Sequence, residues 1–136
     1  MTTAKIIHSS RVKPFVCDAA YSSKMLLDDA VAGTEAINVN EGTLKGGGKT
    51  GGGVHNENEI YYVVRGEAVL HLDDELHDIQ AGDLVFIPAG VFHSLDNKSA
   101  TEDFVLLTLW ERAAYNEVWH TRLQAWGTTF KTIDEE

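Results

Sequence analysis

Three side chains of the kinds that bind metal ions stand close together in this sequence. His55 and Glu59 have three residues between them, and His93 follows after a stretch rich in β-branched residues, tyrosines and turn residues. Two imidazoles and one carboxylate that meet at one point form an open three-ligand site, which is typical of non-haem iron centres. The same ligands also bind Mn, Ni, Co or Zn, so the sequence predicts one divalent transition metal without deciding which.

These ligands need a backbone that presents them on one face. Successive residues of a β-strand point to opposite faces, so His55, Glu57 and Glu59 would share a face if this segment is extended. Glu57 is then a candidate catalytic base or substitute ligand. Tyr61 has the same parity and is a candidate to orient a substrate or donate a proton, the alternative being an aromatic ring packed in the core.

From residue 60 onward, short apolar runs alternate with glycine, proline and aspartate residues that favour turns. Short strands at intervals of about eight to twelve residues predict an all-β sandwich or barrel. We also expect an edge strand within Met1–Asp18, and a short helix or last strand packed outside the sheets within Glu111–Glu136. The predicted strands are Ile60–Val64, Ala68–Leu72, Glu75–Ile79, Leu84–Ile87, Val91–Leu95 and Phe104–Trp110, with a weaker one in Thr34–Leu44.

The segment at residues 46–53 reads GGGKTGGG and holds six of the chain's twelve glycines. It does not match the phosphate-binding loop GxxxxGK[ST], because a strand pattern follows it where that loop needs a helix. One interpretation is a flexible turn between strands. The other is a close approach of the backbone to a ligand, which glycine permits because it has no Cβ. Gly53 and Lys49 would then belong to a substrate pocket, with Lys49 as a cation.

Composition limits the class of protein. The chain has 136 residues, the size of one domain, and a formal net charge of −10, which argues against nucleic acid and anionic membrane as partners. Its one cysteine, Cys17, cannot form an intrachain disulfide, and no apolar run approaches the ~20 residues of a membrane span. We therefore expect a cytoplasmic protein. Trp110, Trp119 and Trp126 are interpreted as core or dimer-interface residues.

The spacing of the candidate ligands and glycines resembles the two motifs of the cupin superfamily of small β-barrels. The first motif, G(X)5HXH(X)3–4E(X)6G, is met by Gly47, Gly53, His55, Glu59 and Gly66, with Gly53 where the family's first histidine usually stands. The second, G(X)5PXG(X)2H(X)3N, is met at every fixed position by Gly82, Pro88, Gly90, His93 and Asn97. The resemblance implies a double-stranded β-helix, or jelly-roll, barrel. It implies a single domain over residues 1–136, with its core at about 36–110.

The departure at Gly53 leaves three alternatives open. Most metal-binding cupins have three histidines and one glutamate, whereas this chain keeps two histidines and the glutamate. The metal would bind with three protein ligands and an extra open position, or Glu57 would serve as a substitute ligand, or metal binding is lost.

The resemblance implies a metal-dependent enzyme that acts on a small oxygenated molecule, such as a hydroxy or keto acid. The extra open position favours a non-haem Fe(II) oxygenase, because substrate and dioxygen would bind together. A metal-dependent isomerase, epimerase or lyase is the alternative, since this fold hosts all of these activities. A barrel that binds a small ligand without turnover is a third possibility. A homodimer is also expected from the resemblance, and it would cover open sheet edges and outward apolar faces.

Overall fold

The computed structural model describes residues 4–34, 36–111 and 117–135, with the backbone alone for residues 117 and 118. The strands are β1 (Phe15–Val16), β2 (Tyr21–Leu27), β3 (Asn38–Leu44), β4 (Glu59–Arg65), β5 (Glu67–Leu72), β6 (Glu75–Gln80), β7 (Leu84–Ile87), β8 (His93–Asn97) and β9 (Phe104–Trp110). The helices are α1 (Asp29–Ala32) and α2 (Glu117–Trp126), and Ser9–Arg11 forms a short 3₁₀ helix.

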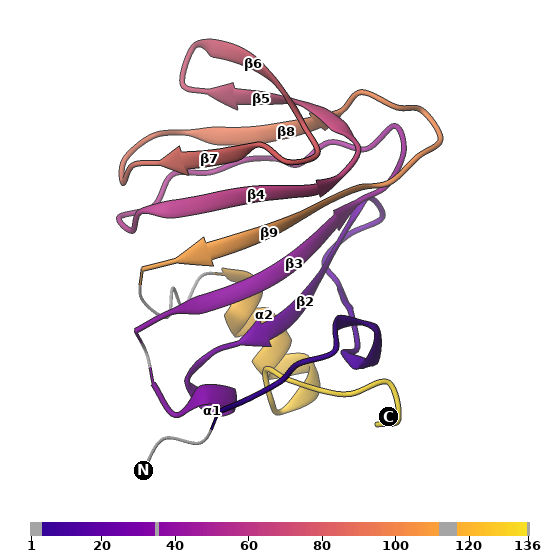
Figure 1. Ribbon diagram of the computed structural model, residues 1–136, viewed down its shortest axis with the longest axis vertical. Helices are drawn as coiled ribbons and strands as arrows, with labels where there is room; N and C mark the ends of the chain where they lie inside the picture. The colour runs from indigo at the N-terminus through magenta and orange to yellow at the C-terminus, as the bar shows by residue number, and fades with distance from the viewer. Residues whose placement is uncertain (1–3, 35, 112–116, 136) are drawn as a thin grey trace.

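Two antiparallel sheets form the barrel (Figure 1). The larger has six strands in the order β1-β2-β3-β9-β4-β7, and the smaller has three in the order β6-β5-β8. Strands distant in the sequence are neighbours, because β9 lies between β3 and β4. The predicted all-β jelly-roll fold is confirmed.

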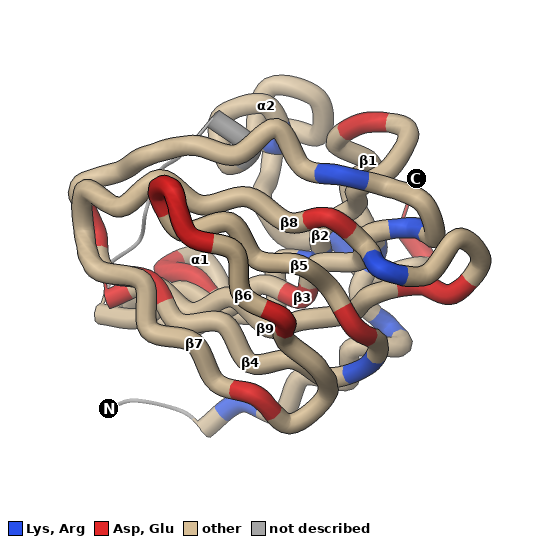
Figure 2. Tube along the Cα trace, turned by 90° about the horizontal axis from the view of Figure 1, so that it is seen from above, with Lys and Arg blue, Asp and Glu red and all other residues tan. Residues whose placement is uncertain are grey.

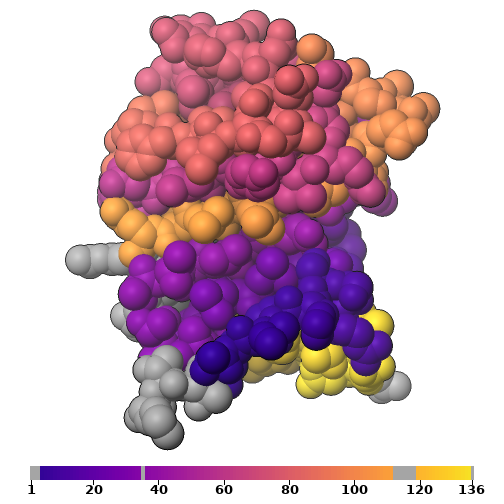
Figure 3. Space-filling model, in the orientation of Figure 1, coloured from indigo at the N-terminus to yellow at the C-terminus, as the bar shows by residue number. Residues whose placement is uncertain are grey.

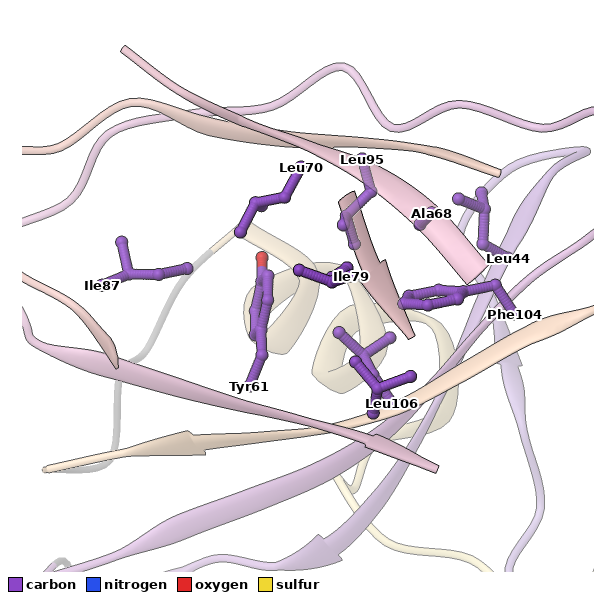
Figure 4. Packing of buried hydrophobic residues seen from close by; sticks show 10 residues of the cluster. Leu44, Tyr61, Ala68, Leu70, Ile79, Ile87, Leu95, Phe104 and Leu106 are labelled. Atoms are coloured by element: carbon purple, nitrogen blue, oxygen red, sulfur yellow. The ribbon is translucent and has the colours of Figure 1, made fainter. Parts of the chain in front are cut away.

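Alternating side chains form the core between the sheets. On β4, Tyr61 and Val63 are buried whereas Tyr62 and Val64 are exposed, which is the period of two expected of a strand with one face inward. Figure 4 shows Tyr61 within this cluster of buried side chains. The cluster contains Leu44, Tyr61, Val63, Ala68, Leu70, Ile79, Ile87, Leu95, Phe104 and Leu106.

The C-terminal helix α2 packs against β1 and β2, at the end of the large sheet away from β7 (Figure 1). The Trp126 ring meets the Phe15 ring edge-on with centroids 5.3 Å apart, and Arg122 donates a hydrogen bond to the Ser23 hydroxyl. Of the two alternatives for the tail, helix or strand, the structure has the helix. Residues 1–3, 35, 112–116 and 136, which fall within predicted segments, lie outside the described residues.

The two ends of the described chain lie side by side at the lower end of the molecule (Figure 3). Val12 forms a β-bridge with Thr132, and the Lys13 amide donates to the Lys131 carbonyl. Strand β1, within the segment expected to hold an edge strand, stands at the edge of the large sheet. The N-terminal segment therefore adds to the chain's own sheet.

Acidic residues outnumber basic ones, 21 to 11, and are spread over several elements rather than gathered on one (Figure 2). Within the described residues, no helix has the length and apolar character needed to cross a membrane.

Candidate metal centre and its cavity

The three predicted ligands converge. The Nε2 atom of His55 lies 3.2 Å from Oε1 of Glu59 and 3.2 Å from Nε2 of His93, and the His93 Nε2 to Glu59 Oε1 distance is also 3.2 Å. Glu59 and His93 are buried and His55 is partly buried. Among the described residues these are the one group of three or more such side chains positioned to hold a metal ion.

Both sheets contribute to this convergence. Glu59 opens β4 in the large sheet, and His93 opens β8 in the small one. Gly53, which precedes β4, pairs with the start of β8. Its amide donates to the His93 carbonyl at 3.2 Å, and its carbonyl accepts from the His93 amide at 3.1 Å. This bridge holds the start of β8 beside the segment that carries His55, so the site depends on contacts between residues about forty positions apart in the chain.

The backbone around His55 differs from the extended strand that the sequence predicted. The segment between His55 and Glu59 is not an extended strand: residues 56 and 57 form a bend, and β4 begins only at Glu59. The bend turns the imidazole of His55 toward Glu59 and leaves Glu57 on the other side of that ring. The carboxylate of Glu57 lies 3.9 Å from Nδ1 of His55, the nitrogen that faces away from the site.

The second nitrogen of each imidazole fixes its orientation. The His55 Nδ1 atom is 3.0 Å from the Glu57 carbonyl oxygen, and the His93 Nδ1 atom is 3.0 Å from the Val91 carbonyl oxygen. A carbonyl only accepts hydrogen bonds, so each Nδ1 carries a proton, and each Nε2 is the nitrogen that would give its lone pair to a metal ion in the site. With the Glu59 carboxylate, three electron-pair donors therefore meet at one point and need a cation between them.

The spacing of these donors suits a divalent transition metal. Bonds of about 2.0–2.2 Å to nitrogen and oxygen place neighbouring ligand atoms about 2.8–3.6 Å apart in octahedral or tetrahedral geometry. The three observed separations of 3.2 Å fall within that range. The donor set is the two-histidine, one-carboxylate triad that occupies one face of a coordination sphere. The residues present thus fit the predicted metal.

Electrostatics around the triad favour a cation too. Without a metal ion, burial lowers the pKa of His93, but the hydrogen bonds that its protonated ring makes to Glu59 and to the Val91 carbonyl outweigh burial, so the pKa lies above the ordinary histidine value. Burial, the charge of Glu59 and the nearby Tyr21 phenol raise the pKa of Tyr61 well above the ordinary tyrosine value. Tyr61 therefore keeps its proton at neutral pH.

The triad opens into one large cavity of about 560 Å³. Of the other predicted site residues, Gly53 and Tyr61 line it. A Cβ added at Gly53 would meet no atom within 4 Å, so the position that usually carries a histidine in cupins is open space here. Glu57 and Lys49 are not among the lining residues, and Lys49 is exposed in a β-bridge to Asp96.

The glycine-rich segment approaches the chain's own backbone closely. Gly52 has φ of +77°, and a Cβ there would lie 2.8 Å from the His93 carbonyl oxygen, so both conformation and space require glycine. The Thr50 amide donates to the Leu95 carbonyl, which continues the contact with β8. The predicted close approach was to a ligand, whereas the close approach that the structure shows is to the chain's own strand β8. Thr50 to Gly53 also line the cavity.

Several cavity residues were not singled out as site residues from the sequence. The Trp110 ring lies 4.2 Å, centroid to centroid, from the His55 ring, so this tryptophan walls the candidate metal centre. The strand period of two could have found the two asparagines, which alternate along β3, but no local pattern marks Arg122 on α2. The missed lining residues include Tyr21, Ser23, Asn38, Asn40, Trp110, Trp119 and Arg122.

Sequence comparison relates this chain to known proteins. The model of the cupin domain family matches residues 40–110, just over half of the chain. An uncharacterized protein of Methanocaldococcus jannaschii is 29% identical over 100 residues, which cover 71% of this chain and 80% of that protein.

Solved structures share the fold. A predicted oxalate decarboxylase from Thermotoga maritima is 27% identical with a TM-score of 0.71, over 79% of this chain and 99% of that one. The polyketide cyclase RemF from Streptomyces resistomycificus is 20% identical with a TM-score of 0.71, over 90% and 94%. An RmlC-like cupin from Shewanella frigidimarina is 18% identical with a TM-score of 0.70, over 87% and 97%. By the match of its sequence to the family model, this chain belongs to the cupin domain family.

Proposed function

We propose that this cupin is a metal-dependent enzyme that acts on a small oxygenated acid, and that its reaction uses dioxygen. The observation that carries the proposal is the three-ligand site with open space at Gly53. A metal ion held by His55, Glu59 and His93 alone would keep positions open for other ligands. A hydroxy or keto acid would bind there through its oxygen atoms, with room left for dioxygen.

A divalent transition metal in this triad would polarise a bound oxygen atom of the substrate and, as Fe(II), would react with dioxygen. The chain's own residues prepare that chemistry. His55 and His93 supply neutral donors and Glu59 supplies one negative charge, so a dipositive ion keeps a net positive charge that attracts an acid. Trp110 limits water at the His55 side of the site.

A non-oxidative lyase or isomerase reaction is the second candidate, and Tyr61 favours it. The raised pKa keeps the phenol protonated, and the ring centroids of Tyr61 and His93 are 6.1 Å apart. A protonated phenol beside the site can return a proton to a carbanion formed from the substrate. The T. maritima relative at 27% identity, described as a predicted oxalate decarboxylase, supports chemistry of this class on a small acid.

The first experiment is the metal content of protein purified without chelator, measured by elemental mass spectrometry. We expect one transition-metal ion per chain in the wild type, and its loss in His93→Ala. His77→Ala is the matched control, because His77 is exposed and pairs with Glu75 outside the cavity, and it should retain the metal. Wild-type protein that takes up no metal even after loading would contradict the enzyme proposal and favour a cupin that binds a small ligand without turnover.

The second experiment separates the two reactions. Protein loaded with Fe(II) is mixed with a panel of α-hydroxy and α-keto acids while dioxygen consumption and acid consumption are recorded. Consumption of both supports the oxygenase. Acid that disappears equally fast without dioxygen overturns the oxygenase and supports the lyase or isomerase, in which case Tyr61→Phe should slow the reaction about a hundred-fold.

A further inference from the structure

An arginine side chain lies inside the cavity that holds the candidate metal centre. Arg122 of α2 is 1% exposed, which makes it the largest fully buried side chain of the described residues. One of its terminal nitrogens, Nη2, donates to the Ser23 hydroxyl at 3.1 Å, and its Nε has no hydrogen-bond partner in the described structure. Its guanidinium carbon lies 5.7 Å from the centroid of the Phe15 ring.

The positive charge of Arg122 lacks a direct counter-ion. Within the part of the chain that the structure describes, the arginine and lysine ion pairs do not include Arg122. Asp28 acts on it only through space, because the Asp28 oxygens accept from the Val31 amide at 3.1 Å and the Thr129 hydroxyl at 2.5 Å. A buried, unpaired cation is costly, and an anion in the cavity would remove that cost.

A polar path leads from Arg122 toward the triad. The Ser23 hydroxyl that accepts from Arg122 donates to Oδ1 of Asn40 at 3.3 Å, and Nδ2 of Asn40 donates to Oδ1 of Asn38 at 2.6 Å. Asn38 pairs across the sheet with Trp110, which in turn pairs with the metal ligand Glu59. These polar side chains line the same cavity.

The sheet register separates the two ends of this path. Ser23 pairs with Gly42, Gly42 with Leu106, and Leu106 with Val63, so Ser23 is three strands away from β4. Val63 is four residues beyond Glu59. On an uncurved sheet this amounts to about 14 Å across the strands and about 13 Å along them. Curvature shortens the gap, but a two-carbon diacid is too short to reach both ends.

One aromatic residue of the cavity, Tyr21, lies over the strand next to β2. Burial raises the pKa of Tyr21 most. The charge of Glu59 raises this pKa further, and the charge of Arg122 lowers it. A Cβ at Gly42 would overlap the Tyr21 hydroxyl oxygen, so the absence of a side chain at Gly42 gives this phenol room over the middle of β3. Tyr21 therefore lines the same cavity as the candidate metal centre and the Arg122 guanidinium.

We propose that Arg122 binds a terminal carboxylate of the substrate, and that the substrate is an extended acid whose other end places its oxygen atoms at the His55, Glu59 and His93 triad. A guanidinium binds a carboxylate through two parallel hydrogen bonds, and this side chain has donors to spare. This inference rests on the proposed function, since it names the class of acid that the enzyme takes.

The test compares acids that differ only at the end distant from the keto group. Wild-type protein loaded with Mn(II) is titrated by calorimetry with α-keto diacids of increasing length, from α-ketoglutarate to α-ketosuberate, and with the matching α-keto monoacids. We expect the longer diacids to bind about ten-fold to a hundred-fold more tightly than their monoacids, the range for hydrogen bonds to a charged group. If each diacid binds no more tightly than its matching monoacid, the proposal is overturned, and no variant is needed to reach that result.

Three variants assign the effect to its residue. Arg122→Gln should lose the preference for diacids and keep the monoacid affinity, whereas Arg122→Lys should keep part of the preference. Arg65→Gln is the matched control, because it removes an exposed arginine of β4 and should bind as the wild type does. An unchanged preference in Arg122→Gln overturns the proposal and leaves Arg122 as a structural cation only.

Metal-free protein separates this inference from the proposed function. The distant carboxylate should still favour the diacid without metal, while the contribution of the keto group should disappear. A protein that binds no metal yet prefers the diacid would contradict the enzyme proposal and support the Arg122 site. A protein that binds the metal but shows no preference for the diacid would contradict the Arg122 site and leave the enzyme proposal standing.

Discussion

At the scale of single residues, Gly53 leaves open space where most metal-binding cupins have a histidine. Its backbone bridges to His93, while its missing side chain leaves empty space beside the triad. No positive φ accompanies this glycine, so a larger residue is compatible with its backbone conformation. Gly53 is therefore replaceable without strain, unlike Gly52, which has φ of +77° and close backbone neighbours.

We expect Gly53→His to add a fourth ligand and to tighten metal retention about ten-fold, equivalent to about 1.4 kcal/mol. Competition with a chelator measures the change. Gly51→His is the control, because a Cβ at Gly51 also meets open space but lies two residues further from the triad. If the oxygenase proposal is correct, Gly53→His should also lower dioxygen consumption. Equal metal retention in both variants would show that position 53 does not face the metal.

Tyr61 links the site to the pH dependence of stability. Its pKa is raised in the folded protein, so above the ordinary tyrosine pKa of about 10 the unfolded chain releases this proton while the folded chain keeps it. The folded state then binds more protons, and the free energy of unfolding falls as the pH rises. The loss should approach about 1.4 kcal/mol per pH unit above 10.

Tyr61→Phe should remove part of that dependence, leaving the contribution of Tyr21, whose pKa is also raised by burial. Urea unfolding of the wild type and the variant at pH 8 and at pH 11 measures it. The exposed neighbour Tyr62 supplies the control Tyr62→Phe, which should follow the wild type. A Tyr61→Phe variant that loses as much stability at high pH as the wild type would disprove this assignment.

At the scale of elements, the C-terminal segment is fastened to the sheet through a small helix. Asp28 caps α1 by accepting from the Val31 amide, and it also accepts from the Thr129 hydroxyl just after α2. Both Asp28 and Thr129 are buried. This contact holds the end of α2, and with it Arg122, against the inner side of β2.

We expect Asp28→Ala to lower the free energy of unfolding by about 2–4 kcal/mol, because it removes a helix cap and leaves the Thr129 hydroxyl buried without an acceptor. Chemical denaturation measures this loss. Asp74→Ala, in the exposed turn between β5 and β6, should change stability by less than about 0.5 kcal/mol. Similar losses in the two variants would mean that the contact with Thr129 contributes little.

At the scale of the whole molecule, one outer face of the barrel is apolar. Tyr62 and Val64 of β4 and Leu84 and Phe86 of β7 are exposed large side chains, and β7 is an edge strand of the large sheet. Tyr62 pairs directly with Leu84 across the two strands. An exposed apolar patch beside an open edge is typical of a protein interface.

We expect a second copy of the chain to cover this face, in keeping with the predicted homodimer. Phe86→Lys should convert the dimer to a monomer, as measured by light scattering after size-exclusion chromatography. Leu76→Lys introduces the same charge at an exposed leucine of β6, in the other sheet, and should leave the dimer intact. A wild-type protein that is monomeric at high concentration would contradict the prediction.

The sequence alone determined the fold class and the triad. The bounds of β7 and β9 were predicted correctly because both are compact apolar runs between turn residues, and strand periodicity is a local signal. Helix α1 has only four residues and was missed, and β8 begins later than predicted because the turn after Pro88 is followed by two irregular residues, Val91 and Phe92. His55, Glu59 and His93 were found because their spacing matches a known pattern.

The tertiary structure decided what surrounds those ligands. The bend at residues 56 and 57 places the Glu57 carboxylate on the far side of His55, whereas strand parity predicted that both side chains would share one face. Arg122 reaches the cavity because α2 folds back over β2, a contact between residues 99 positions apart. Side-chain types and local spacing are properties of the sequence, whereas the meeting of distant segments depends on how the whole chain packs. The sequence therefore showed the candidate metal ligands, and only the fold revealed the guanidinium that shares their cavity.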